Sequence, residues 1–461
     1  MRQYNLIKPE TRFLDSKKIT FMNNKILNMS CTSLINSQAK IRYGCILGIL
    51  LLIILINPAQ AQQIDILLKG GHVIDPKNDI DYPMDVAIAD GKILQVASNI
   101  STDNASKVVN VSGLYVTPGL IDMHAHLFQG HDNSSWLANA HGSVAPDAFT
   151  FRSGITTIVD AGSSGWRNFP KFKQQTIDKS NTRVLAFLSI VGEGMQGRHT
   201  AQNLNDMEPV VTSLIAKQYS DYIVGIKKHH YMGSDFIPVE RAVKAAELAN
   251  IPVMVDFGDA DPPLSLETLF MEKLRPGDMF THTYSFTPNR GEIVDENFEV
   301  KPIIFEAQER GIVFDVGHGQ GSWIWHQAIP SFEQGFYPDV ISTDLHIWSM
   351  NHAMKDMNNV MSKLLSMGMS LQDVILRSTW NPAQYIKRKD LGHLTEGADA
   401  DIAVINLIDG EFGYLDSLLK TMKGNKKLET ELTILNGRVM WDLNGMASPE
   451  WDELPGDRYG W

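Results

Sequence analysis

The chain has 461 residues, with 41 Lys or Arg against 53 Asp or Glu, which gives a formal net charge of −12. This length exceeds one ordinary domain, so we expect two domains, or one large barrel with a smaller companion. The acidic balance argues against nucleic acid and anionic membranes as partners. The only cysteines, Cys31 and Cys45, lie close to the N-terminus, so neither disulfides nor thiolate metal sites are expected in the folded part.

Residues 1–61 have the pattern of a signal peptide. Lys40 and Arg42 precede an apolar run over residues 44–56, and an Ala-x-Ala motif ends at Ala61. We therefore expect cleavage after Ala61 and a periplasmic or secreted protein. An uncleaved anchor is the alternative, although the run is shorter than the ~20 residues of a membrane span. Without these residues, which hold eight Lys or Arg and two Asp or Glu, the net charge becomes −18.

Short strands and turns fill residues 62–115 and return in residues 393–445. Asp90-Gly91 between two apolar stretches is a typical two-residue hairpin turn. Because the two β-rich parts enclose a region of different texture, we predict one small β-sandwich domain built from both chain ends. Residues 446–461 form a tail with no role that the sequence assigns.

Residues 116–392 alternate strands with helix-like segments. Eight β/α units over roughly 270 residues predict a (β/α)8 TIM barrel, whose active site lies at the carboxyl ends of the strands. A doubly wound sheet is the alternative. The eight predicted strands are 120–126, 154–160, 183–190, 222–227, 251–256, 278–282, 311–316 and 339–344.

Ionisable residues end many of these strands, which favours the barrel. On an extended strand, side chains i and i+2 point the same way, so His124 and His126 can offer two imidazoles to one ion such as zinc. Convergence of several strand ends on one barrel mouth predicts a metal site. Its candidate ligands are His124, His126, Lys227, Asp256, His282 and Asp344. We interpret His72 and His393, in the β-rich parts, as structural or surface residues.

The chain resembles the amidohydrolase superfamily, most of all its dihydroorotase-like amidohydrolase/deacetylase group. The resemblance covers about residues 64 to 442. The segments that carry it are Gly119 to His126, Gly225-Ile226-Lys227, Thr281-His282, Asp315 to Gly319, Ser342-Thr343-Asp344, Asn381-Pro382-Ala383 and Gly397 to Ile402. The resemblance implies a TIM barrel with a β-sandwich from both ends. It also implies a binuclear metal centre bridged by a carboxylated lysine, here Lys227. Burial suits lysine for that role because it lowers the pKa of the amine, which can then react with CO2.

One position departs from the family pattern. The fifth strand ends in Asp256, where the family usually has a histidine. A carboxylate still binds zinc, but it adds negative charge and favours harder ions such as Mn2+. The sequence therefore leaves open whether one or two ions bind. His229 and His230, close to Lys227, are possible replacements for the missing ligand.

The expected reaction follows from the metal site. A divalent ion lowers the pKa of a bound water, and Asp344 acts as general base. His318 is a candidate contact of the substrate or of a residue that binds it, and Arg198 either clamps a substrate carboxylate or is a surface residue. Trp323, Trp325 and Trp348 lie on loops at the predicted mouth, as an apolar wall or as ordinary packing.

We thus predict a metal-dependent hydrolase that cleaves an amide or acyl (acetyl) ester bond of a small molecule. Cyclic-amide hydrolysis, as in dihydroorotases and hydantoinases, is the first alternative. A non-catalytic binding protein on the same scaffold is the second. Homo-oligomerisation stays open.

Overall fold

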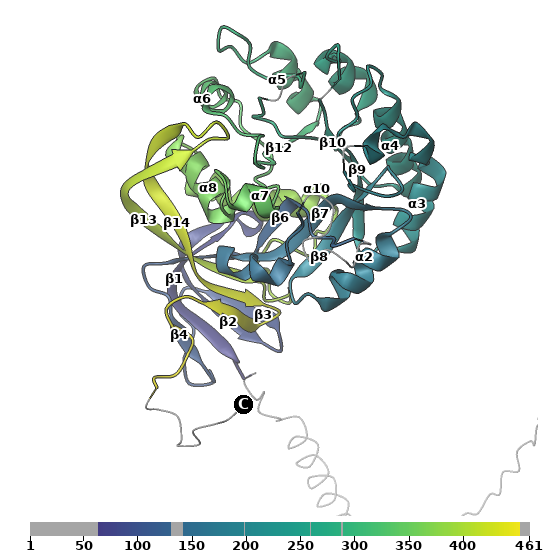
Figure 1. Ribbon diagram of the computed structural model, residues 1–461. Helices are drawn as coiled ribbons and strands as arrows, with labels where there is room; N and C mark the ends of the chain where they lie inside the picture. Colours follow the sequence, from purple (N-terminus) through teal and green to yellow (C-terminus); the bar gives the residue numbers. More distant parts are fainter. Residues whose placement is uncertain (1–62, 131–141, 198, 259, 287–288, 452–461) are drawn as a thin grey trace, which may run out of the picture. The chain divides into compact units, whose positions relative to one another are not determined.

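Two β-sheets carry the fold (Figure 1). The computed structural model describes residues 63–130, 142–197, 199–258, 260–286 and 289–451. The predicted leader, its cleavage site, Arg198 and most of the tail lie outside these residues. Within them, no helix is both long and apolar enough to cross a membrane.

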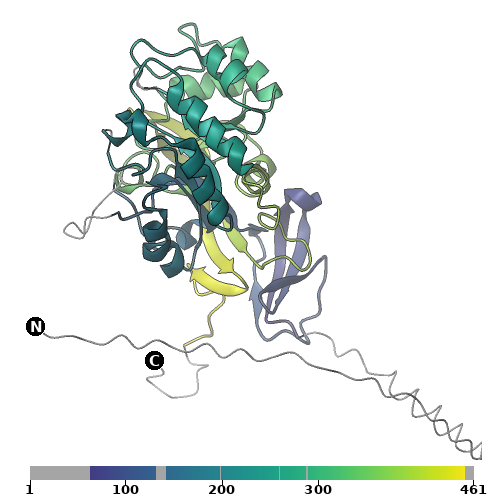
Figure 2. The ribbon, with the colours of Figure 1, turned by 90° about the vertical axis from the view of Figure 1, so that its right-hand side faces the viewer.

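The first sheet combines both chain ends, in the order β15-β14-β13-β5-β1-β2-β3 with β4 beside β1. Figure 2 shows the purple strands of the N-terminal part beside the yellow strands of the C-terminal part. Its strands are β1 (Ile66–Asp75), β2 (Ile80–Ala89), β3 (Lys92–Ala97), β4 (Val108–Asn110), β5 (Tyr115–Pro118), β13 (Ile402–Leu415), β14 (Thr421–Leu435) and β15 (Arg438–Asp442).

The sequence explains this sheet locally. Asp90 and Gly91 both have positive φ, of 51° and 74°, and they join β2 to β3 as the predicted hairpin turn. Alternation along β1 and β2 sends Leu68 and Val86 into one apolar cluster and Leu67 and Ala87 into another.

The second sheet is parallel, with the order β12-β11-β10-β9-β8-β7-β6, and it curls into the barrel. Its strands are β6 (Leu120–Ala125), β7 (Ile155–Gly165), β8 (Arg183–Ser189), β9 (Ile223–Lys228), β10 (Val253–Asp256), β11 (Met279–Thr281) and β12 (Val313–Asp315). The predicted TIM barrel with a small β domain from both chain ends is confirmed. Seven of the eight predicted barrel strands are strands in the described residues.

The eighth predicted strand, 339–344, is not a regular strand. It closes the ring through two isolated bridges, Asp315 with Val340 and Ala125 with Leu345. Asp344 has a φ of 52°, a left-handed conformation that a strand does not tolerate, so the ladder breaks where the site begins. The apolar run thus predicted the place of the segment in the barrel but not its hydrogen-bonding pattern.

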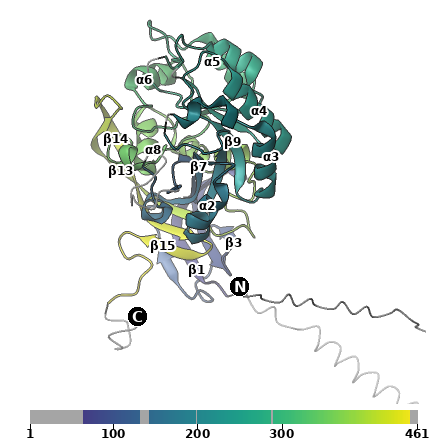
Figure 3. The same cartoon turned by 45° about the vertical axis from the view of Figure 1, so that its right-hand side comes forward.

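Helices cover the outside of the barrel, and α3 and α4 lie outside β9 (Figures 1 and 3). The helices are α2 (Phe169–Gln175), α3 (Pro209–Gln218), α4 (Ile237–Ala249), α5 (Pro302–Glu309), α6 (Trp325–Glu333), α7 (Ile347–Met350), α8 (Met357–Ser366), α9 (Leu371–Leu376) and α10 (Trp380–Tyr385), with a π-helical segment at Thr268–Lys273.

The barrel interior is packed with apolar side chains, whereas polar side chains lie at the carboxyl ends of the strands. Met254, Met279 and Val313 belong to the apolar cluster inside the barrel. Two residues further along the same three strands stand Asp256, Thr281 and Asp315, each buried. Because side chains two apart share a face, the packed core itself directs polar groups to the mouth.

Candidate metal centre

A pocket of about 250 Å³ opens at the carboxyl ends of the barrel strands. The six predicted metal ligands come from five different strands or strand ends, and all six line this pocket. The lining residues are His124, His126, Met195, Lys227, His230, Asp256, His282, Arg290, Gln320, Gly321, Ser322, Asp344, His346 and Trp348.

His124 and His126 sit where β6 ends, and both side chains are buried. The Nδ1 atom of His124 lies 2.9 Å from Thr281 Oγ1 and 3.3 Å from Asp315 Oδ2. The Nδ1 atom of His126 lies 3.0 Å from Ser163 Oγ. With Nδ1 held from outside, each ring turns its Nε2 atom toward the pocket, the arrangement that metal-binding histidines use.

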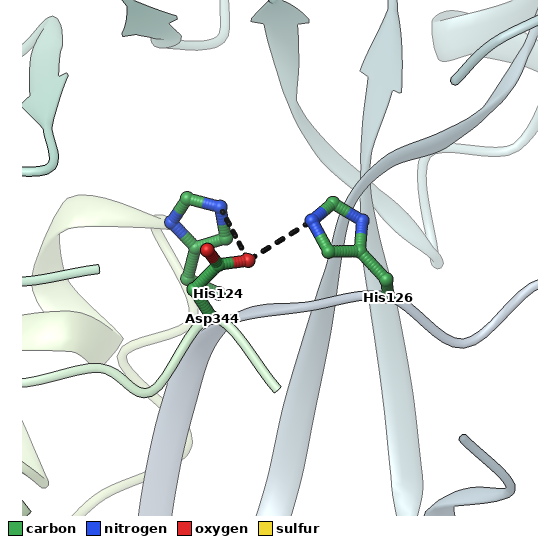
Figure 4. Close-up of side chains that lie close together, drawn as sticks. All are labelled: His124, His126 and Asp344. Carbon is green, nitrogen blue, oxygen red and sulfur yellow. Dashed lines mark ion pairs between the residues drawn. The ribbon is translucent and has the colours of Figure 1, made fainter. Parts of the chain in front are cut away.

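Asp344 completes the group (Figure 4). Its Oδ1 atom lies 3.0 Å from His126 Nε2 and 3.5 Å from His124 Nε2. This oxygen is buried and has no hydrogen-bond partner among the described residues, although buried carboxylate oxygens are nearly always paired. One ligand atom from each of His124, His126 and Asp344 lies within 4.8 Å of the other two, so the three residues suit one divalent ion.

The charge states agree with that role. Burial lowers the pKa of His124 to about 3, with the Lys227 ammonium acting in the same direction, so the ring is neutral at pH 7 and able to bind a metal. Burial by itself raises the pKa of Asp344, but His124 and His126 hold it well below its usual range. Asp344 is therefore an ionised carboxylate beside the neutral imidazole of His124.

Lys227 ends β9 beside this group and is fully buried. Its Nζ atom lies 3.1 Å from His124 Nε2. Burial lowers the pKa of Lys227, which favours the uncharged, nucleophilic amine.

Asp256 occupies a different setting in the same pocket. Its Oδ1 atom accepts a hydrogen bond of 2.7 Å from Arg290, and its Oδ2 atom lies 3.2 Å from His230 Nε2 and 3.7 Å from His282 Nε2. Burial alone raises the pKa of Asp256, but Arg290 and His282 hold it well below its usual range. Both oxygens of this carboxylate thus face positively polarised nitrogen atoms, and its role as a ligand stays a prediction.

The two histidines after Lys227 separate. His230 lines the pocket and contacts Asp256, whereas His229 lies outside the lining, with its Nε2 atom 2.9 Å from Ser189 Oγ. Consecutive residues on a strand diverge in this way.

His318 is not among the residues that line the pocket. Its ring is buried and stacked on Trp323 at 5.3 Å, and Lys363 Nζ donates to its Nε2 atom at 2.6 Å. Trp323 and Trp325 are buried core residues, while Trp348 lines the pocket and is 48% exposed. The wall interpretation therefore holds for Trp348 alone.

Two ionisable pocket residues were missed in the sequence, His346 and Arg290. His346 follows Asp344 at i+2, the same spacing that marked His124 and His126, and this signal was available. Arg290 lies in an irregular loop after β11, and no pattern in the sequence marks it.

Comparisons with known proteins agree with this architecture. The amidohydrolase family matches residues 328–440. A deacetylase of Brucella anthropi is 31% identical over 78% of this chain and 88% of its own length. A crystal structure of an adenine deaminase superposes with a TM-score of 0.74 at 27% identity over 82% of this chain and 100% of its own. A dihydroorotase structure gives 0.70 at 28% identity, over 82% and 99%. The chain therefore belongs to the amidohydrolase family, as its sequence predicted, and it is a hydrolase of amide or acyl bonds.

Proposed function

We propose that the chain hydrolyses an acyl group from a small molecule, as a metal-dependent deacylase with an amide or acyl ester substrate. The observation that carries this proposal is the group of His124, His126 and Asp344, which brings three buried ligand atoms close together. One of them is an oxygen that has no hydrogen-bond partner in the part of the chain that the structure describes.

Different residues of the pocket would bind the ion and transfer the proton. A divalent ion bound there supplies a Lewis acid and lowers the pKa of a coordinated water. His124 and His126 bind as neutral imidazoles, each oriented through its Nδ1 atom. Asp344, ionised at neutral pH, accepts the proton of the attacking water and returns it to the leaving group. His346, whose Nε2 atom lies 3.9 Å from Asp344 Oδ2, borders the path of that proton.

We propose zinc as the ion, since two imidazoles and one carboxylate are a ligand set that zinc accepts. Carboxylation of Lys227 belongs to the same proposal. What supports it is the buried amine 3.1 Å from His124 Nε2, where a carbamate adds an oxygen ligand beside the other three. We further propose that the mature protein begins at Gln62 in the periplasm or outside the cell. N-terminal sequencing of exported protein tests this, and an intact leader contradicts it.

Deacylation is favoured over other reactions because the deacetylase relative matches along most of both chains. The pocket adds an apolar surface, from Met195 and Trp348, that suits an acyl group or an aromatic leaving group. Cyclic-amide hydrolysis is the second candidate, favoured by the likeness to a dihydroorotase structure.

The test is a substrate screen on metal-free and metal-loaded protein. N-acyl amino acids, acetyl esters and cyclic imides are offered to protein that was stripped with a chelator and then reloaded with Zn2+ or Mn2+. We expect turnover of an acyl substrate that disappears on chelation and returns with the ion. Turnover of cyclic imides alone selects the second candidate, and equal rates with and without chelator contradict the proposal.

A further inference from the structure

Asp256 and Arg290 form a buried ion pair in the pocket, at the place where the family resemblance puts a second metal. Arg290 Nη2 donates to Asp256 Oδ1 at 2.7 Å, and the two side chains are 8% and 2% exposed. A donor atom of a metal site carries a free lone pair, as Asp344 Oδ1 does. One oxygen of Asp256 instead accepts a hydrogen bond from the Arg290 guanidinium, and the other lies near His230.

Residues around Arg290 hydrogen-bond to it and leave room for its side chain. Its Nη1 atom lies 3.2 Å from Ser285 Oγ and 3.5 Å from Ser322 Oγ. The side chain passes over Gly258, where an added Cβ atom would come within 2.7 Å of Arg290 Cγ and Nε. Residue 258 must therefore be glycine for Arg290 to reach Asp256 in this way.

Arg290 also has one unpaired hydrogen-bond donor within the described residues. Its Nε atom is buried and has no hydrogen-bond partner among the described residues, although Arg290 lines the pocket. An unpaired buried N–H is costly and calls for an acceptor. An oxygen atom of a bound substrate would be such an acceptor.

Electrostatics separate the two halves of the pocket. A divalent cation beside Asp256 meets the fixed positive charge of Arg290, which is always protonated. Among the described residues, Asp344 is ion-paired with histidines and not with an arginine, and Lys227 Nζ lies 3.1 Å from His124 Nε2. The residues at the second position thus do not fit a metal ion.

We propose that Arg290 takes the place of a second metal ion. The chain then holds one divalent ion, at His124, His126 and Asp344, and Arg290, anchored by Asp256, donates to an oxygen of the substrate from the other side. This inference rests on the proposed function for its substrate and on the ion-pair geometry for the number of ions.

The experiment counts ions by mass spectrometry of the metal-loaded protein after unbound Zn2+ has been removed. We expect one equivalent per chain in the wild type, one in Asp256→Asn, and a large loss in His126→Ala. Two equivalents in the wild type, with one lost in Asp256→Asn, overturn the inference. Fewer than one in the wild type also overturns it.

Kinetics test the role of Arg290. We expect Arg290→Met to keep its ion and its melting temperature but to lose about 100-fold or more in kcat/KM, the scale of one lost donor to a reacting oxygen. Arg290→Lys should recover part of the loss. The matched control is Arg388→Met, since Arg388 is ion-paired with Asp390 at 2.8 Å outside the pocket. An unchanged kcat/KM in Arg290→Met, or loss of its ion, contradicts the assigned role.

The two failures can be told apart. A protein that binds one ion but hydrolyses no acyl substrate sinks the proposed function and leaves the ion count intact. A protein that hydrolyses acyl substrates with two ions leaves the function intact and removes the inference.

Discussion

The two halves of the pocket differ in how their carboxylates are used. Asp344 Oδ1 is buried between two imidazoles and lacks a hydrogen-bond partner within the described residues, while Asp256 accepts a hydrogen bond of 2.7 Å from Arg290. Both are aspartates at carboxyl ends of barrel segments, and a sequence pattern treats them alike. The difference predicts that the two carboxylates have different roles, because only Asp344 leaves an oxygen lone pair open to an ion.

The largest effect on activity is expected at Asp344. Asp344→Asn keeps the shape of the side chain but removes its charge and its basicity. We expect kcat/KM to fall roughly 1,000-fold or more, since both the ligand and the proton acceptor are lost. Steady-state kinetics with a metal assay measure this, and a loss below about 10-fold would show that Asp344 is not the base.

Lys227 tests the same comparison because its Nζ atom lies 3.1 Å from His124 Nε2, in the group with Asp344. If its carbamate is a ligand, Lys227→Ala should lose most of its metal and activity, and a small carboxylic acid such as formate should restore part of both. The control is Lys228→Ala, because Lys228 is also a buried lysine but does not line the pocket. In the wild type its Nζ atom donates to the backbone oxygen of Asp256 at 2.8 Å. Full metal content and rate in Lys227→Ala would remove Lys227 from the site.

The outer partners of the histidines should give smaller effects. Asp315 and Thr281 hold His124 through its Nδ1 atom, and Ser163 holds His126. We expect Asp315→Asn and Ser163→Ala to weaken metal affinity by about 10–100-fold, as loss of such partners typically does. Competition with a chelator measures this. Unchanged affinity in both variants would mean that the rings are oriented by packing alone.

The smallest effect concerns stability at acidic pH. Burial, with Lys363 nearby, holds the pKa of His318 well below its usual range, so the unfolded chain takes up a proton first as the pH falls. His318 should therefore cost stability as the pH drops below about 6.5, the pKa of an unperturbed histidine. We expect the melting temperature of His318→Gln to fall less between pH 7 and pH 5 than that of the wild type. Parallel curves for the two proteins would refute this.

Much of the architecture was predictable from the sequence. The Asp90-Gly91 turn, the apolar strand runs and the His124–His126 spacing follow from local rules, and the structure has them. The irregular eighth segment was not predictable, because the positive φ of Asp344 is imposed by contacts with strands far away in the sequence.

The site was predictable only in part. All six predicted ligands line one pocket, but no local pattern reveals that Arg290 pairs with Asp256, 34 residues away. That pair depends on a loop conformation and on the room left by Gly258. His318 was predicted to contact the substrate or a residue that binds it, and in the structure its ring stacks on Trp323 and does not line the pocket.

The most direct test of the account is an anomalous difference map from crystals of the zinc-loaded protein. We predict one strong peak per chain, bonded to His124 Nε2, His126 Nε2 and an oxygen of Asp344 at about 2.0–2.2 Å, the usual zinc distances. Arg290 should still contact Asp256 in the same map. A peak bonded to Asp256 with Arg290 displaced, or no peak beside His124 and His126, would contradict the account.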